Sequence, residues 1–145
     1  MKDLSIEQYR SLAEFRYQIR RFLGFSEEQV RAAGMEPQQH QLLLAIKGLP
    51  DGERASIGEL AGRLQLKHHS TVELVNRLEK AGYVARSADE QDRRQVIVHL
   101  THSGASILRK LSIAHHEELE IAGPGLAKAL RSLALQHGMK KRSAA

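Results

Sequence analysis

The chain has 145 residues, enough for one domain with its own core and too few for two of ordinary size. Hydrophobic residues make up 41% and charged residues 27% of it, which excludes a disordered or fibrous chain. Cysteine is absent, so disulfides and thiol-based redox sensing are excluded as well. The net charge of +5 attracts polyanions, but it is too modest to establish a nucleic-acid partner without the arrangement of the charges.

The sequence shows no sign of a membrane or secreted protein. No apolar run approaches the roughly 20 residues needed to cross a bilayer, and the first residues lack the apolar core of a signal peptide. We therefore expect a cytoplasmic protein without a membrane partner. Because aromatic residues make up only 4% of the chain, its core must come from Leu, Ile, Val and Ala, which favours helices.

The first part of the chain has the apolar spacing of amphipathic helices. A helix is predicted over residues 5–23, where apolar residues recur at spacings of three, four and three: Leu12, Phe15, Ile19 and Phe22. Gly24 is expected to end it. Pro37 suits a first helical turn, which predicts a second helix over residues 37–47.

Two short helices joined by a tight turn are predicted next. Ser56 followed by Glu59 fits a capping box, in which each side chain satisfies a backbone N–H at the start of a helix over residues 57–64. Residues 65–67 are long enough only for a tight turn. The following helix has one apolar face, formed by Thr71, Leu74, Val75 and Leu78. Such a pair of helices is a helix-turn-helix.

The pattern then changes to that of strands. Residues 83–86 and 96–100 are short β-prone runs on either side of a polar loop, which predicts a hairpin with a charged tip. Thr101 is expected to cap a long helix whose apolar spacing resembles a coiled-coil seam. The Gly-Pro-Gly segment at 123–125 is expected to break this helix before a last one with Leu126, Leu130 and Leu133 on one side.

This order of elements is that of a winged helix-turn-helix, a mainly α (α+β) fold whose second motif helix enters the major groove while the hairpin reaches the minor groove. We expect a single domain over residues 1–145, with a DNA-binding lobe at about 37–100 and dimerisation helices at about 4–34 and 101–138. A two-fold homodimer is predicted because one apolar seam is too extensive to be satisfied within one chain: Leu12, Ile19, Ile107, Leu111, Ala114, Leu126 and Leu130.

Four runs of sequence carry a family resemblance: Glu59–Leu64, Leu74–Val84, Asp89–Arg94, and Val98–Thr101 with Gly104. With them the chain resembles the multiple antibiotic resistance regulator (MarR) family over nearly its whole length. The resemblance implies a bacterial, ligand-responsive transcription regulator, by family default a repressor, that binds a palindromic double-stranded DNA operator as a homodimer. It also implies a protein without a cofactor.

The resemblance identifies Asp92, Arg93 and Arg94 as the family's wing motif. A guanidinium in a narrow minor groove gains from the concentrated negative potential there, but an unrestrained arginine loses much of that gain to side-chain ordering. An aspartate two residues earlier can hold the guanidinium through a charge-assisted hydrogen bond. The alternative interpretation is a hairpin tip whose charges only keep it soluble.

The outer face of the second motif helix supplies the candidates for reading bases. Hydroxyl, amide and imidazole groups bond base edges or phosphates, and a carboxylate accepts from cytosine. The predicted DNA contacts on this helix are Lys67, His68, His69, Ser70, Glu73 and Asn76. Arg54 and Arg77 are expected at phosphates, which position a protein without specifying sequence. For each of these residues simple exposure to solvent is the alternative.

A small-molecule site is implied by the resemblance as well. Members of the family bind small aromatic acids between the dimerisation helices and the DNA-binding lobe. In this chain Arg16 and Arg20 could pair with a carboxylate and Phe15 could form an apolar wall. His40 opens the second predicted helix nearby. Phe15 in a dimer core with solvated arginines is the alternative.

The sequence also bears on three other functions. A zinc-responsive regulator of the same fold is one, but the adjacent His115 and His116 lack the i, i+4 partner of a helical metal pair, so no metal site is predicted. An enzyme is not expected, because no nucleophile motif, metal-protease motif or phosphate-binding glycine loop is present. A helical protein-interaction module without DNA binding would need no wing arginine.

Overall fold

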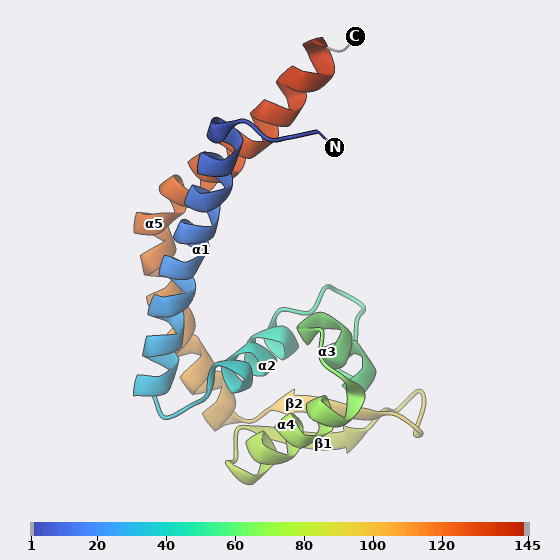
Figure 1. The fold of residues 1–145 in the computed structure, drawn as a ribbon. Helices are drawn as coiled ribbons and strands as arrows, with labels where there is room; N and C mark the ends of the chain where they lie inside the picture. The colour runs from blue at the N-terminus through green and yellow to red at the C-terminus, as the bar shows by residue number, and fades with distance from the viewer. Residues whose placement is uncertain (1, 144–145) are drawn as a thin grey trace. The chain divides into compact units, whose positions relative to one another are not determined.

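The computed structural model describes residues 2–143, with side chains described as far as residue 135. The elements follow the predicted order: α1 (Ile6–Ala32), α2 (Pro37–Lys47), α3 (Ile57–Leu64), α4 (His68–Lys80), β1 (Val84–Ala88), β2 (Val96–Leu100) and α5 (His102–Ser143) (Figure 1). The predicted fold class, mainly helical with one small antiparallel sheet, is confirmed. None of the described helices is long and apolar enough to span a membrane.

The chain divides into two compact units. One consists of residues 29–112 and contains α2, α3, α4 and the hairpin, and the other consists of the described parts of residues 1–28 and 113–145. Burial of apolar side chains away from water is the main stabilising term of the first unit. Its core consists of Val30, Met35, Leu42, Leu43, Ala55, Leu60, Leu74, Val75, Leu78, Val84, Val98, Leu108 and Leu111. The predicted apolar face of α4 therefore lies in this core.

The helix-turn-helix forms where the sequence predicts it, but its capping box is only half formed. The Ser56 hydroxyl accepts from the backbone N–H of Glu59 at 3.2 Å, which caps α3. The Glu59 carboxylate instead accepts from Arg63 Nε at 3.0 Å, one turn further along the helix. The turn is closed by Gln65, whose φ of 53° is left-handed, and by Leu66 N–H donating to the Ala61 carbonyl at 3.0 Å.

The hairpin packs directly after α4. Gly82 has φ of 84°, a conformation that favours glycine, and it turns the chain from the helix into β1. Strands β1 and β2 pair antiparallel from Val84↔Leu100 to Ala88↔Val96, so β1 ends two residues later than predicted and the tip loop is shorter. The Ala55 carbonyl accepts from the backbone N–H of Val98 at 2.9 Å, which attaches the segment before α3 to the edge of β2.

Two predicted helix ends are wrong. Helix α1 continues through Gly24 to Ala32, because one glycine costs a helix only about 1 kcal/mol and the added turns bury Val30. Helix α5 continues through Pro124, so the predicted separate last helix does not exist. The proline removes one backbone hydrogen bond, and α5 continues past it beside the Gln18 side chain of α1, which lies next to Gly125.

Part of the predicted dimer seam is also wrong. Leu111 is 3% exposed and belongs to the core of the 29–112 unit, and Ile107 packs against the same core. Both side chains therefore pack against residues of their own chain. Leu12 and Leu130 are exposed, in the other unit. Periodicity identified an apolar face of α5 correctly, but it could not tell which partner covers each part of that face.

Candidate nucleic-acid interface

The hairpin tip holds one arginine in a fixed position. Arg94 donates to the Asp92 carboxylate through its backbone N–H at 3.1 Å and through Nε at 3.0 Å, and its Nη2 lies 3.4 Å from the second carboxylate oxygen. The Arg94 hydrogen bonds hold the pKa of Asp92 below its usual value, so the pair is present at neutral pH and is lost only as the pH falls through that lowered pKa. The Arg94 side chain is 91% exposed, and the restrained guanidinium therefore projects into solvent.

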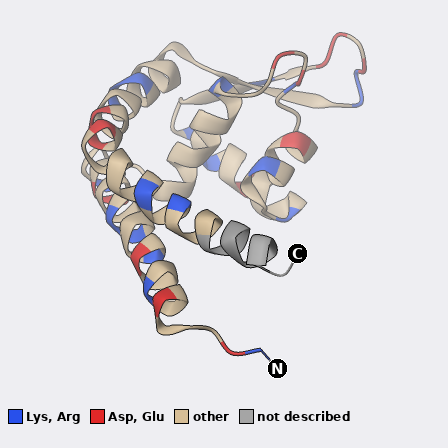
Figure 2. Cartoon of the chain, turned by 90° about the horizontal axis from the view of Figure 1, so that it is seen from above, with Lys and Arg blue, Asp and Glu red and all other residues tan. Residues whose placement is uncertain are grey.

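The tip carries residues of both charge signs (Figure 2). Arg93 is exposed beside Arg94, and no side chain in the described part of the protein pairs with it. The structure thus brings the three predicted wing residues together, with one acidic residue restraining one of two exposed arginines.

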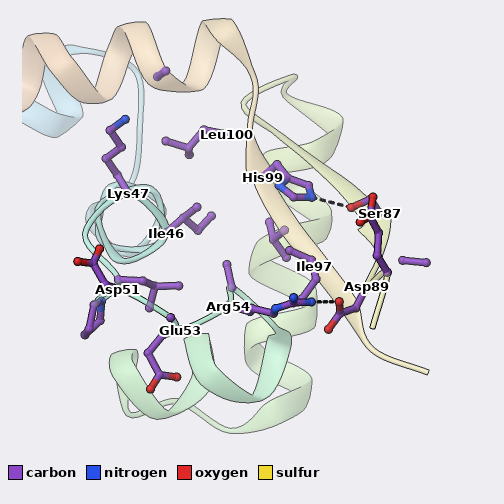
Figure 3. A pocket seen from close by; sticks show the side chains of 18 residues that line it. Ile46, Lys47, Asp51, Glu53, Arg54, Ser87, Asp89, Ile97, His99 and Leu100 are labelled. Carbon is purple, nitrogen blue, oxygen red and sulfur yellow. Dashed lines mark hydrogen bonds and ion pairs between the residues drawn. The ribbon is translucent and has the colours of Figure 1, made fainter. Parts of the chain in front are cut away.

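The base of the hairpin is held by a second ion pair. Arg54, on the loop before α3, donates to the Asp89 carboxylate, which is 5% exposed and also accepts from the backbone N–H of Gln91 at 3.0 Å. Figure 3 shows this pair at one end of a cavity of about 920 Å³ between the end of α2, the loop and the hairpin. The Arg54 guanidinium is therefore committed to Asp89, which limits its predicted role at a phosphate.

No pattern in the sequence indicates that Asp89 is a partner of Arg54. The two residues lie 35 positions apart on different elements, and no spacing rule connects them. Only the fold, which brings the loop before α3 against the hairpin, places the carboxylate beside the guanidinium.

The outer face of α4 presents most of the predicted base-reading side chains. Lys67 is the N-cap and makes no side-chain capping bond, and the exposed His68 and His69 begin the helix. Ser70 is half-buried, while Glu73, Asn76 and Arg77 are exposed. A helix start without a side-chain cap leaves its first N–H groups to other acceptors, which suits a phosphate.

Arg86 is a further residue of this surface that the sequence did not indicate. From β1 it donates through Nη2 to Asn76 Oδ1 on α4, and its Nε lies 3.8 Å from Glu79 Oε2 on the same helix. The guanidinium thus joins the hairpin to the helix.

The structure does not group the predicted small-molecule residues in one compact unit. Phe15 is half-buried on α1 with Arg16 and Arg20 exposed, all in the unit that contains residues 1–28, whereas His40 is buried in the 29–112 unit. Among the side chains that the structure describes, no group of three or more His, Asp or Glu is placed to hold a metal ion.

A helix-turn-helix with a polar outer face, followed by a hairpin that displays a restrained arginine, defines a winged helix-turn-helix protein. Residues 33–95 match the MarR family, the family that the sequence runs of this region resemble. The resemblance predicted from sequence is confirmed.

The similar proteins are regulators by name. YfiV, an uncharacterized HTH-type transcriptional regulator of Bacillus subtilis, is 33% identical over 98 residues, which are 68% of this chain. This chain spans 59% of the length of YfiV. AbsC, a MarR family transcriptional regulator from Streptomyces coelicolor, has a crystal structure similar over the whole of both chains, with a TM-score of 0.74 and 19% identity.

FabT from Streptococcus pneumoniae, crystallised in complex with DNA, has a TM-score of 0.70 and 22% identity over 94% of this chain and 98% of that one. YfiV and AbsC are named as transcriptional regulators and not as enzymes, in agreement with the expectation that this chain is not an enzyme.

Proposed function

We propose that this chain is a sequence-specific DNA-binding transcriptional regulator, a ligand-responsive repressor that binds a palindromic operator as a homodimer. The observation that carries the proposal is the pairing of Asp92 with an exposed Arg94 at the tip of a hairpin that follows a helix-turn-helix. The similarity in fold to FabT, which was crystallised with DNA, supports it.

In this function the two parts of the interface have different roles. Helix α4 enters the major groove, where its polar outer face meets base edges and its uncapped start meets the phosphate backbone. The hairpin tip reaches the adjacent minor groove, where Arg94 meets the strongest negative potential. Asp92 contributes by reducing the number of conformations that Arg94 loses on binding.

Replacing Arg94 with alanine is expected to weaken operator binding by about 1–3 kcal/mol, the range for a single specific contact. Asp92→Ala is expected to weaken binding less, because it removes only the restraint on Arg94. The double variant should bind about as weakly as Arg94→Ala, since residues that act through one contact are not additive. Fluorescence anisotropy with a labelled operator duplex measures all three.

The sign of the Asp92 effect distinguishes the two interpretations of the tip. If the tip only solubilises the protein, deleting a negative charge near DNA should tighten binding, so a gain in affinity for Asp92→Ala would overturn the restraint. Thermal unfolding serves as the control, because all three variants change exposed tip residues and should leave Tm nearly unchanged.

The homodimer part of the proposal rests on apolar side chains of α1 and α5 that one chain leaves exposed. Ile121 is 79% exposed and Leu130 is 53% exposed. Several others of the same unit are exposed too: Leu12, Tyr17, Leu23, Ile113, Leu119 and Leu135. Large exposed apolar surfaces on soluble proteins commonly mark protein–protein interfaces.

We expect the protein to sediment as a dimer at micromolar concentration, with operator half-sites about 34–36 Å apart. Leu130→Lys should shift it toward monomer, because the dimer would bury an unpaired charge. Leu44→Lys is a matched control, since Leu44 is 48% exposed in the other unit. A wild-type protein that sediments as a monomer contradicts the homodimer.

The effector part of the proposal rests on α1. Arg16 and Arg20 are exposed one turn apart, and no acidic partner occupies either of them in the described part of the chain. A small aromatic acid offers the carboxylate that an arginine binds through two hydrogen bonds and a ring for the half-buried Phe15.

A further inference from the structure

Arg86 on β1 contacts two side chains of α4, and this contact has no role in the DNA binding described above. Asn76 and Glu79 are three residues apart, so their side chains share one face of the helix, and the Arg86 guanidinium from β1 reaches both. The Arg86 side chain is 31% exposed, in contrast to the 91% of Arg94. Arg86 is thus directed at the helix and is not displayed to solvent as the wing arginine is.

The contact determines what Asn76 can offer to a ligand. A side-chain amide has one oxygen that accepts and one nitrogen that donates two hydrogen bonds. The Arg86 Nη2 donates to the Asn76 oxygen, and within the described part of the chain no group accepts from the Asn76 nitrogen. Because Asn76 is exposed on the outer face of α4, it presents donors outward while its acceptor is engaged.

A donor distinguishes two classes of base in the major groove. Guanine presents two acceptors there, N7 and O6, and thymine presents O4, whereas cytosine presents only an amino donor and adenine presents an amino donor beside its N7 acceptor. A side chain that only donates is therefore matched best by the keto bases. The usual asparagine contact with adenine needs both the amide oxygen and the amide nitrogen, and here Arg86 competes for the oxygen.

We propose that Arg86 is a positioning residue that fixes Asn76 as a hydrogen-bond donor, so that the operator carries a keto base, guanine or thymine, at the position that Asn76 faces. The inference rests on the proposed function, since it concerns which sequence this protein selects. It makes Asn76 and Arg86 a specificity-determining pair whose members lie on different elements. Glu79 balances the charge of Arg86, so the arginine does not act as a phosphate contact.

The test is a selection of binding sites from randomised duplexes. Wild-type protein is expected to prefer keto over amino bases about fivefold or more at one position in each half-site, and Asn76→Ala to abolish the preference at that position. Arg86→Met releases the amide oxygen, so adenine should gain about fivefold against the keto bases at the same position. The double variant should match Asn76→Ala.

Two further variants separate base reading from fold stability. Asn76→Asp keeps an acceptor for Arg86 but has no donor, so it should lose the keto preference while its thermal unfolding stays close to that of the wild type. Arg109→Met removes an exposed arginine from α5 and should leave the selected sequence unchanged.

The outcomes are distinguishable. An unchanged keto preference in Arg86→Met, or an unchanged profile in Asn76→Ala, overturns this inference and leaves the proposed function in place. A wild-type protein that enriches no sequence overturns the proposed function and this inference with it.

Discussion

Replacing Gly104 with alanine is expected to destabilise the protein by about 3 kcal/mol, at the upper end of the range for inserting a side chain into a packed site. Gly104 is buried in the first turn of α5, where an added Cβ would lie 2.9 Å from the carbonyl carbon of Tyr83 and closer still to its oxygen. The clash is with backbone, so no side-chain rotation relieves it.

The start of α5 also has little freedom to move away. Thr101 donates through its backbone N–H to the Tyr83 carbonyl at 3.1 Å and through its hydroxyl to the Gly82 carbonyl at 2.6 Å. The same hydroxyl accepts from Gly104 N–H at 3.1 Å. A shift that makes room for the methyl group therefore breaks the contacts that join α5 to the hairpin.

Thermal unfolding measures this effect, with an expected fall in Tm of roughly 6–12 °C for a chain of this size. Gly62→Ala is the matched control, because Gly62 is helical and nothing lies within 4 Å of an added Cβ. There alanine should raise stability by up to about 1 kcal/mol. Equal Tm values for Gly104→Ala and the wild type contradict the close approach of α5 to Tyr83.

The second large effect is expected for Arg54→Met. Removing one partner of a buried ion pair costs about 3–5 kcal/mol, because the other charge remains buried without compensation. Asp89 is 5% exposed but Arg54 is 42% exposed, so water already screens part of the pair and we expect about 2 kcal/mol. Asp89→Asn should cost less, since the amide oxygen still accepts from Gln91 N–H and the freed guanidinium can reach solvent.

Urea unfolding compares these variants with Arg63→Met, which removes an arginine from an exposed pair with Glu59 and should cost no more than about 0.5 kcal/mol. The double variant Arg54→Met with Asp89→Asn should be more stable than Arg54→Met alone, because it leaves no buried charge. If Arg54→Met and Arg63→Met lower the free energy of unfolding by the same amount, the ion pair at the hairpin base does not stabilise the fold as we infer.

The sequence predicted those parts of the fold and site that depend on local spacing. The apolar face of α4 follows from helical periodicity, the hairpin from two β-prone runs, and the Asp92–Arg94 contact from a separation of two residues. Each of these features is determined within one element or one turn.

What the sequence could not predict depends on contacts between distant segments. Arg54 meets Asp89 across 35 residues, and Arg86 meets Asn76 across 10, between different elements. Gly24 and Pro124 are both local signals for a break that the helices do not obey, and for α1 the burial of Val30 beyond Gly24 outweighs the cost of the glycine.

The attachment of the hairpin also bears on how its sequence can change. The base is fixed by Arg54, by the bond from Val98 to Ala55 and by strand pairing, whereas within the described part of the chain the hydrogen bonds of residues 90–94 stay within 89–95. Insertions and deletions at such an exposed tip leave the strand register intact. The reach of the wing can therefore diverge during evolution while the helix-turn-helix that it borders stays the same.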